Sequence, residues 1–390
     1  MGPRTVLYVH SSADLYGSDR TLYALVTRLD RSRYIPLVLL PEDGPLRHAL
    51  EERGVETHVV PLSVLHRTLA PGYWLRFWGQ LPGSVRKLTR ELNSRQVSLV
   101  HSNTSHVFDG ALAARMAGIP HLWHIREPFP SLRPIGILIR HLAQSLSQHV
   151  LCVSEAVRRD YFPSGGNENS VGVLYDGVDL TQFTPEVDGS PVRRELGLSP
   201  DAPVVGMAGR IAAWKGHRLF LEMAARLIVQ VPGVHFLVVG DAVTPRDRAW
   251  KSTLLAQVKQ LDLTERVHFI GVRQDMPQVM AALDVLVHPS LMPEPWGMVV
   301  LEAMATGKPV VATGHGGPVE MICHGETGYL VPPHAPDILA ACVGALLSTP
   351  EMGRQMGLAG RRRCEAYFGV ERTSQLIQDI YDRIIAVSSR

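Results

Sequence analysis

The sequence predicts an α/β protein with two Rossmann-like domains, each built on a doubly wound parallel sheet. The chain has 390 residues, more than one ordinary core holds, and this length favours two domains. Short apolar runs alternate with longer amphipathic segments, which is the order expected of βαβ units. A stretch rich in glycine and proline separates two complete series of such runs.

The predicted strands fall into these two series. In the first half they are expected at Thr5–His10, Ile35–Leu40, Thr57–Val60, Ser98–His101, His121–Ile125 and Val150–Val153. In the second half they are expected at Val204–Ala208, Val234–Val239, Val267–Ile270, Val285–His288, Pro309–Ala312 and Gly328–Val331. The segment His217–Val229 is predicted to be a helix, because its apolar residues gather on one face at helical spacing.

The break between the domains is expected within Asp188–Asp201, which contains Gly189, Pro191 and Pro200. We therefore predict a first domain over residues 1–187 and a second over residues 188–368. The last segment, residues 369–390, is amphipathic and is followed by no strand. It is expected to form a helix that crosses back to the first domain.

Composition excludes several classes of protein. A net charge of +2 gives no indication of nucleic-acid binding. The four cysteines form no CxxC pair, which argues against a zinc site or a disulfide framework. No apolar run has the length of a membrane span, and the run Val6–Val9 is too short for a signal peptide. We expect a cytoplasmic protein, with peripheral contact at the inner face of the cell membrane as an open possibility.

A first candidate site follows the strand Val204–Ala208. The sequence Gly206–Arg210 is followed by Lys215 and then by Gly216, which opens a helix. Glycines let the backbone approach a ligand, and a helix N-terminus presents free amides to an anion. With Arg210 and Lys215 beside them, these groups form a candidate diphosphate clamp. A plain βα turn with two solvated basic residues is the alternative.

A second candidate site is the run from Glu294 to Glu302, in which two glutamates bracket Gly297 at a predicted helix start. The amides of Gly297, Met298 and Val299 can point at phosphate oxygens. Glu302 lies too far along the helix to oppose a phosphate and could bind ribose hydroxyls. A capping carboxylate followed by an ordinary helical glutamate is the alternative, which the bracketed glycine makes less attractive.

The run Glu294–Glu302 resembles the E-x7-E motif of glycosyltransferase family 4 (GT4), whose members have the GT-B fold. Further signatures similar to the family's occur in the same order along the whole chain, at Asp176–Asp179, Gly209–Arg210, Lys215–Gly216, Val238–Asp241, Glu302–Ala305, Gly307–Val310 and Gly316–Gly317. The resemblance implies two Rossmann-like domains facing across a cleft. The first domain would bind the acceptor and the second a nucleotide-sugar donor.

The resemblance also implies roles for individual residues. Arg210 and Lys215 match the residues that bind the phosphates, Glu302 the one that binds the ribose, Glu294 the glutamate beside the donor sugar, and Gly297, Met298 and Val299 the amides that contact phosphate and sugar. Val272 matches the backbone that contacts the base. Among these residues, Glu294, Arg210 and Lys215 are also our catalytic candidates.

In the first domain, Leu15–Arg20 resembles the family's glycine-rich loop. Tyr16 replaces the first glycine and Asp19 replaces the usual glutamate, which leaves Gly17 as the expected point of close approach to the donor. His124 ends a predicted strand where the family has a histidine near the reacting sugar, and it is our fourth catalytic candidate. Without the resemblance, a satisfied core histidine is the simpler interpretation of His124.

The chemistry that the resemblance implies is transfer with retention at the anomeric carbon. Arg210, Lys215 and the helix amides would supply positive potential where the leaving diphosphate gains charge. The sequence has no Asp-x-Asp pair for a divalent ion, so we expect activity without a metal and no cofactor beyond the co-substrate. The resemblance also implies a front-face mechanism, in which the leaving phosphate accepts the acceptor's proton, and no well-placed nucleophile is evident.

The acceptor is expected to be a glycan or a lipid-linked glycan of the cell envelope. Aromatic and basic residues are mixed in His66–Arg95, and Arg133–Arg140 repeats this pattern. Such a mixture suits an anionic membrane interface or a groove for a lipid-linked acceptor. Helices that cover the sheet with solvated arginines are the alternative.

Two other functions compete with glycosyl transfer. A nucleotide-sugar epimerase can share the fold and the diphosphate site, and it would convert its donor without an acceptor. A non-catalytic nucleotide-sugar binder is the other. The presence of Arg210, Lys215, Glu294 and Glu302 argues against a site that has lost its catalytic residues.

Overall fold

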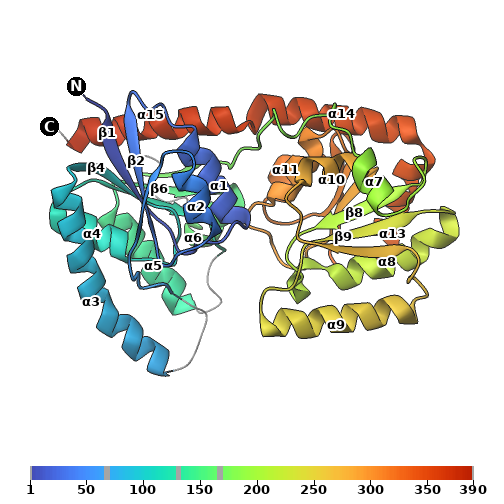
Figure 1. The fold of residues 1–390 in the computed structure, drawn as a ribbon, viewed down its shortest axis with the longest axis horizontal. Coiled ribbons are helices and arrows are strands. Elements are labelled where there is room, and N and C mark those ends of the chain that lie inside the picture. The colour runs from blue at the N-terminus through green and yellow to red at the C-terminus, as the bar shows by residue number, and fades with distance from the viewer. Residues whose placement is uncertain (1, 66–70, 129–132, 165–169, 389–390) are drawn as a thin grey trace. The chain divides into compact units, whose positions relative to one another are not determined.

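The computed structural model describes residues 2–65, 71–128, 133–164 and 170–388. The chain divides into two compact units. The first unit contains Met1–Gly177 and Val370–Arg390, and the second contains Val178–Gly369. Figure 1 shows that each unit has its own central sheet with helices packed against it.

The first unit is built on a seven-stranded sheet in the order β3-β2-β1-β4-β5-β6-β7. Its strands are β1 (Arg4–Val9), β2 (Tyr34–Leu40), β3 (Glu56–Val59), β4 (Val97–Ser102), β5 (His121–Ile125), β6 (His149–Cys152) and β7 (Val171–Val173). Its helices are α1 (Gly17–Thr27), α2 (Pro45–Glu51), α3 (Pro71–Ser94), α4 (Asp109–Ala117), α5 (Arg133–Leu146), α6 (Glu155–Tyr161) and α15 (Val370–Ser388). Every paired strand runs parallel to its neighbour.

The second unit is built on a six-stranded parallel sheet in the order β10-β9-β8-β11-β12-β13. Its strands are β8 (Val204–Ala208), β9 (His235–Val239), β10 (Val267–Gly271), β11 (Val285–His288), β12 (Val310–Thr313) and β13 (Gly328–Val331). Its helices are α7 (Ser190–Glu195), α8 (His217–Gln230), α9 (Pro245–Gln260), α10 (Met276–Ala282), α11 (Met298–Ala305), α12 (Pro318–Met321), α13 (Pro336–Ser348) and α14 (Pro350–Tyr367), with a short 3-10 turn at Ala213–Lys215.

The predicted α/β class with two doubly wound parallel sheets is confirmed. All twelve predicted strands correspond to strands of the structure, and the limits of each agree to within about a residue at either end. The prediction omitted β7, a three-residue edge strand. A strand this short has too few residues to show a periodic apolar pattern.

Strand order reverses once in each sheet, between β1 and β4 in the first unit and between β8 and β11 in the second. At such a switch point the loops on the two sides turn away from each other and leave a crevice outside the carboxyl ends of the strands. The residues that follow β1, β4, β8 and β11 are therefore positioned to contact a ligand.

Both faces of each sheet are covered, as a parallel sheet requires. In the first unit, apolar residues of α1, α2 and α15 pack on one face, and those of α3 and α4 pack on the other. In the second unit, a core around Phe220, Phe236 and Leu254 joins α8 and α9 to one face of the sheet, and α11 contacts β11 and β12 on the other. Within the described ranges, none of the helices has the length and hydropathy that crossing a bilayer demands.

The boundary between the units lies at Gly177/Val178, earlier than the predicted boundary at residue 188. The cause is local pairing in the second unit. The Val178 amide donates to the Phe368 carbonyl at 2.8 Å, and Arg361 donates to the carbonyls of Leu180 and Phe183. These contacts join residues 178–187 to α14, so the glycine and proline stretch at 188–201 lies inside the unit.

The final helix α15 belongs to the first unit. The Tyr381 hydroxyl lies 2.8 Å from that of Tyr8 and 2.6 Å from His101 Nδ1. Asp382 accepts from the Tyr34 hydroxyl at 2.6 Å. Because these partners lie on β1, β2 and β4, the helix is fixed to the centre of the first sheet.

Candidate active site

The carboxyl edge of the six-stranded sheet is shaped by glycines with left-handed backbone. Gly209 follows β8 with φ 147°, and Gly240 follows β9 with φ 118°. A Cβ on Gly240 would lie 2.2 Å from the Gly209 carbonyl oxygen, so only glycine allows these two loops to touch. The loop that carries Arg210 therefore packs directly on the next loop.

Lys215 reaches the centre of this edge because of the glycine that follows it. Gly216 has φ 78°, and a Cβ there would lie 1.8 Å from the Pro289 carbonyl oxygen. This close approach joins the start of α8 to the loop after β11. Lys215, the last residue of the 3-10 turn, is thereby turned toward residues 288–294.

The Lys215 ammonium and the Glu294 carboxylate form an ion pair. Lys215 Nζ lies 2.7 Å from Glu294 Oε1 and 2.8 Å from Oε2. The Ser290 hydroxyl donates to Glu294 Oε2 at 3.0 Å, and His288 Nε2 lies 3.5 Å from the same oxygen. The indole of Trp214 lies 4.4 Å from the ammonium and supports it through its π face.

This pairing keeps Glu294 ionised although its side chain is nearly buried. Burial by itself raises the pKa of a carboxyl group. The charge of Lys215 and the hydrogen bond from His288 outweigh that effect and hold the pKa of Glu294 well below its ordinary value. The site therefore carries a fixed carboxylate in contact with a fixed ammonium.

The backbone of Glu294 is held by a second pair of glycines. Gly316 forms a parallel bridge with Glu294, and the Gly317 amide donates to the Glu294 carbonyl at 2.8 Å. A Cβ on Gly316 would lie 2.2 Å from that carbonyl oxygen, and one on Gly317 would lie 2.3 Å from the Trp296 carbonyl oxygen. The position of the carboxylate thus depends on a loop after β12.

The helix α11 begins beside this ion pair. Gly297 has φ 109° and caps the helix, and a Cβ on it would lie 3.6 Å from both Glu294 Cγ and His288 Nε2. The amides of Met298 and Val299 are in the first turn, where a helix leaves its N–H groups without partners within the helix. Glu302 lies further along α11 and its side chain is mostly buried.

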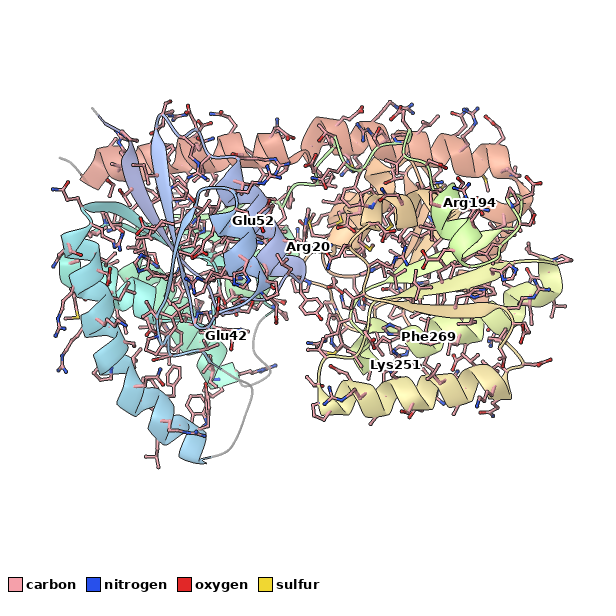
Figure 2. The ribbon with its side chains drawn as sticks, in the orientation of Figure 1. Arg20, Glu42, Glu52, Arg194, Lys251 and Phe269 are labelled. Atoms are coloured by element: carbon pink, nitrogen blue, oxygen red, sulfur yellow. The ribbon has the colours of Figure 1, made fainter. Side chains whose placement is uncertain are left out.

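Arg210 and Val272 lie at the same sheet edge but are more exposed. Arg210 Nε is 3.7 Å from Asp247 Oδ2, a loose contact that leaves much of the guanidinium in solvent. Nearby, Lys251 on α9, which is labelled in Figure 2, donates to Asp241 at 2.7 Å. Val272 directly follows β10 and is half exposed. Arg210 and Val272 therefore line the edge without contacting the ion pair.

In the first unit, Gly17 is the exposed first residue of α1. Asp19 is buried and organises the loop: it accepts from the Tyr16 amide at 3.0 Å and pairs with His10 Nε2 at 2.8 Å. It also accepts from the Ser12 hydroxyl. The acid of this loop is thus engaged inside the unit, while Gly17 is free of steric contact.

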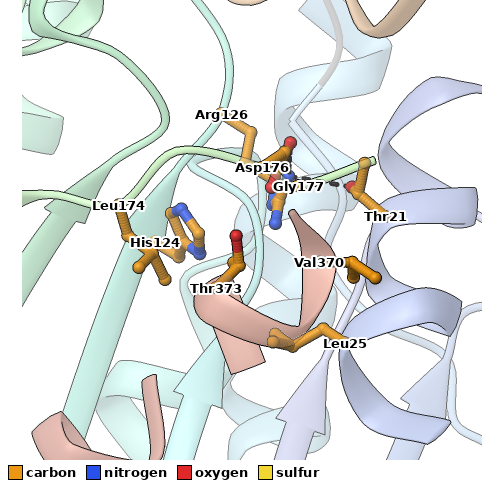
Figure 3. Close-up of a pocket in the computed structure, with 9 residues that line it drawn as sticks. All are labelled: Thr21, Leu25, His124, Arg126, Leu174, Asp176, Gly177, Val370 and Thr373. Atoms are coloured by element: carbon orange, nitrogen blue, oxygen red, sulfur yellow. Dashed lines mark hydrogen bonds and ion pairs between the residues drawn. The ribbon is translucent and has the colours of Figure 1, made fainter. Parts of the chain in front are cut away.

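His124 is fully buried in the first unit and lines a small cavity with Arg126, Asp176, Thr21 and Thr373 (Figure 3). Neither ring nitrogen has a hydrogen-bond partner among the described residues. The ring stacks on His101 at 5.6 Å between centroids. Burial, together with the neighbouring Arg126 charge and His101, lowers the pKa of His124 well below its ordinary value, so the ring is neutral.

Arg126 holds a buried polar network around this cavity. It donates to Asn103 Oδ1 at 2.8 Å, to the Thr21 hydroxyl at 2.9 Å and to Asp176 Oδ2 at 2.6 Å. Asn103 in turn contacts His10 Nδ1 at 3.2 Å. The network links the loops after β1, β4, β5 and β7 at the carboxyl edge of the first sheet.

The structure thus brings together Lys215, Glu294, Gly297, Met298 and Val299. Arg210, Val272 and Glu302 lie at the same edge or in the same helix, whereas Gly17 and His124 belong to the first unit. Sequence reasoning missed His288 and Ser290 as partners of Glu294, and it missed the Arg126 network. For His288, the available signal was its position at the end of a predicted strand.

Within the residues that the structure describes, no group of three or more His, Cys, Asp or Glu side chains is arranged to hold a metal ion. Metal independence itself stays a prediction, because it concerns activity.

Comparisons with known proteins assign the two halves of the chain to related families. Residues 190–363 match the family "Glycosyl transferases group 1", and residues 15–182 match "Glycosyltransferase Family 4". Alpha-maltose-1-phosphate synthase of Mycolicibacterium smegmatis is 31% identical over 323 residues, covering 75% of this chain and 81% of that protein. D-inositol 3-phosphate glycosyltransferase of Nocardia farcinica is 31% identical, covering 81% of this chain and 68% of that protein.

The fold also matches solved structures over nearly its whole length. The Anabaena protein HepE, crystallised in complex with UDP-glucose, superposes with a TM-score of 0.84 at 28% identity, covering 97% of this chain and 99% of that one. The family matches to both halves of the sequence, the two parallel sheets and the relatives that cover most of the chain all indicate the same family and fold. The chain belongs to glycosyltransferase family 4 (GT4) and has the GT-B fold.

Proposed function

We propose that this chain is a retaining hexosyltransferase that uses a nucleotide-diphosphate sugar, needs no metal ion, and transfers the hexosyl group to an acceptor hydroxyl. The observation that carries the proposal is the Lys215–Glu294 pair beside the start of α11. Family membership supports glycosyl transfer, and the complex of HepE with UDP-glucose supports a nucleotide-sugar donor.

The diphosphate would bind at the start of α11. Unpaired amides of the first turn and the positive end of the helix dipole attract phosphate oxygens. Arg210 is exposed at the same sheet edge and can turn its planar guanidinium toward a phosphate. The helix amides are fixed before the reaction, so they would stabilise the charge that grows on the leaving diphosphate.

Lys215 and Glu294 would act on opposite sides of the breaking bond. An ammonium has three N–H donors, so Lys215 can hold Glu294 and still donate to a phosphate oxygen. The ionised carboxylate can accept hydrogen bonds from the hydroxyls of the donor sugar and can stabilise an oxocarbenium-like transition state. Each partner orients the other, but Lys215 would chiefly hold the phosphate and Glu294 would chiefly act on the reacting sugar.

The remaining predicted residues would hold the nucleoside and close the donor site. Glu302 would accept hydrogen bonds from the ribose hydroxyls, and the backbone at Val272 would contact the base. Gly17 would allow the first domain's loop to approach the donor, and His124 would act near the reacting sugar. All four roles stay predictions, and His124 is fully buried in its unit.

In the proposed step, the bond between the anomeric carbon and the phosphate oxygen breaks with its electron pair going to the diphosphate. The acceptor oxygen forms the new bond on the same face of the sugar. Its proton passes to a non-bridging oxygen of the departing phosphate. The configuration is retained without a covalent glycosyl-enzyme, and no further reactant is required.

The acceptor would be a glycan or a lipid-linked glycan of the cell envelope.

The test begins with donor binding by calorimetry using UDP-glucose, GDP-mannose and ADP-glucose. Incubation of the bound donor with candidate acceptors and NMR of the product then gives the anomeric configuration. Retention, with activity that survives exhaustive chelation, is expected. An inverted product, or activity restored only by added Mg²⁺ or Mn²⁺, contradicts the proposal.

Variants connect this test to the site. Lys215→Ala and Glu302→Ala are expected to weaken donor binding, while Glu294→Ala chiefly lowers kcat, by roughly 10²–10³-fold as for other preorganised groups at a reacting centre. Lys259→Ala, in the last turn of α9, is the matched control and should behave as wild type. Wild-type rates in all three site variants would show that the site lies elsewhere. Donor conversion without an acceptor would indicate an epimerase.

A further inference from the structure

Helix α14 packs against α11, the helix whose start forms part of the candidate site (Figure 1). The contacts run in opposite order along the two helices, so the helices are antiparallel. A Cβ on Gly360 would lie 3.4 Å from Met304 Cγ, and one turn later the Cys364 thiol donates to the Leu301 carbonyl at 3.9 Å. This register brings Phe368, the residue after α14, to the start of α11.

At that point the Trp296 indole packs on the Phe368 ring. Trp296 directly precedes Gly297, the residue that caps α11. The two ring centroids lie 5.7 Å apart with 68° between the planes, an edge-to-face arrangement. Trp296 is 4% exposed and Phe368 is 2% exposed. The indole therefore has almost no surface left for a bound ligand, and any effect that it has on the site acts through the backbone.

Phe368 is itself held in place on several sides. Its carbonyl accepts from the Val178 amide at 2.8 Å. The Arg363 guanidinium lies 5.6 Å from the centre of its ring and donates to the Met321 carbonyl at the end of α12 at 2.7 Å. Trp296 thus packs on a fixed ring and not on a mobile side chain.

The backbone around Trp296 has few free torsions. Pro293 and Pro295 flank Glu294, and the ring of each proline fixes φ. The glycines of the loop after β12 pack closely on the same backbone. Because so little rotation is left, the place of the indole determines the direction of the carboxylate before it and of the amides after it.

We propose that Trp296 is a positioning residue of the donor site. Its indole, packed on Phe368, fixes the backbone on both sides of it. The Glu294 carboxylate is thereby held beside Lys215, and the first amides of α11 are held toward the place of the diphosphate. The inference rests on the proposed function, because it takes these groups to be the ones that bind the donor. It adds a residue that touches no ligand, and it gives α14 a part in forming the site.

The first test needs no ligand. Amide hydrogen exchange of the full chain is measured at Gly317, whose amide donates to the Glu294 carbonyl at 2.8 Å. Exchange is expressed relative to the slowest amides of the second unit, which report its global unfolding. Phe368→Leu removes the partner ring and leaves Trp296 in place. It should accelerate exchange at Gly317 roughly two- to tenfold, the equivalent of one edge-to-face ring pair. Unchanged exchange overturns the proposal.

Phe236→Leu is the matched control, because it also removes one ring of a buried edge-to-face pair in the same unit. Phe236 packs on Phe220 with 6.0 Å between centroids and lies near the amino end of β9, away from the carboxyl edge. The control should lower the free energy of unfolding but leave the relative exchange at Gly317 as in wild type. Equal acceleration in both variants would show a general loss of packing and would also overturn the proposal.

Turnover distinguishes positioning from packing. With the best of UDP-glucose, GDP-mannose and ADP-glucose at saturation, Trp296→Leu and Phe368→Leu should each lower kcat, by up to about 10²-fold as for other misplaced reacting groups. The double variant should lose no more than the more affected single variant, because both changes remove the same contact. Trp296→Phe retains a ring and should recover most of the activity. Phe236→Leu should have wild-type kcat. Multiplicative losses in the double variant would contradict the proposal.

The two readouts separate this inference from the proposed function. Faster exchange at Gly317 in Phe368→Leu, with a wild type that binds none of the three nucleotide sugars, would contradict the proposed function alone. A wild type that transfers sugar, with full kcat in Phe368→Leu, would contradict the positioning role alone. If Trp296→Leu does not fold, Phe368→Leu decides both readouts, because it removes the contact from the other side.

Discussion

The two units share one sheet plan but treat their polar residues in different ways. At the carboxyl edge of the second sheet, Lys215 and Glu294 form a charged pair on loops shaped by glycines. At the corresponding edge of the first sheet, Arg126 and Asp176 are sealed in a network with Asn103. At the edge of the second sheet, the charged pair lies beside the start of α11. At the edge of the first sheet, the charged pair holds loops together.

Under the proposed function, the charged pair of the second unit would bind the donor, whereas the network of the first unit would have a structural role. Four experiments test the contrast, beginning with the change expected to have the largest effect.

Arg126→Met is expected to destabilise the protein by about 3–5 kcal/mol, because it leaves the buried Asp176 carboxylate without its guanidinium. Denaturant unfolding measures the loss, and Asp176→Asn added to the same variant should recover part of it. Arg115→Met, on the exposed surface of α4, is the control. Loss of less than about 1 kcal/mol would mean that the network is not a structural one.

Gly216→Ala should impair the donor site strongly, whereas Gly17→Ala should leave stability within about 0.5 kcal/mol of wild type. At Gly216 a methyl group meets the Pro289 carbonyl at 1.8 Å and the backbone is left-handed, so the Lys215 loop must move. At Gly17 there is open space. Calorimetry with UDP-glucose and thermal unfolding report both effects. Equal donor affinity in wild type and Gly216→Ala would contradict the role assigned to this close approach.

His124→Phe distinguishes a catalytic from a structural histidine. The substitution replaces a buried ring with two unpaired nitrogens by an apolar ring, so the melting temperature should stay the same or rise. The predicted catalytic role requires that kcat falls at least tenfold, or about 1.4 kcal/mol, in the same variant. Wild-type kcat would remove His124 from the catalytic candidates.

The pH dependence of stability should contain a contribution from His121, a buried residue bonded to Ser102 and Ser147. Burial lowers its pKa from 6.5 to about 3. Between these two pH values His121 is protonated in the unfolded chain but not in the folded chain. The free energy of unfolding therefore decreases as pH falls from 6.5 toward 3. Unfolding free energies at pH 7, 6 and 5 should fall less steeply in His121→Gln. An unchanged slope would contradict this assignment.

Local patterns were sufficient to predict most of the fold. The strand at Val204–Ala208 and the helix from His217 follow from apolar runs and their spacing, because burial on a parallel sheet imposes those patterns. The edge strand β7 lacks such a run. The boundary at Gly177/Val178 depends on the contact between Val178 and Phe368, which lie far apart in the sequence.

The same distinction applies to the candidate site. Gly297 and Glu294 could be predicted because the glycine and the carboxylate are close in sequence. The contacts of Glu294 with Lys215 and of Arg126 with Asp176 span many residues, so no window of sequence contains both partners. These contacts between loops depend on the assembled sheets and not on a local sequence pattern.

The ion pair between Lys215 and Glu294 means that the ammonium already has a counter-ion within the protein. A bare inorganic phosphate bound to Lys215 would lie close to the Glu294 carboxylate, and the two negative charges would repel each other. A ligand that presents hydroxyl groups to the carboxylate and oxyanions to the ammonium would place hydrogen-bond donors next to the carboxylate instead. Under the proposed function, this arrangement would favour a sugar nucleotide over small inorganic anions before any ligand binds.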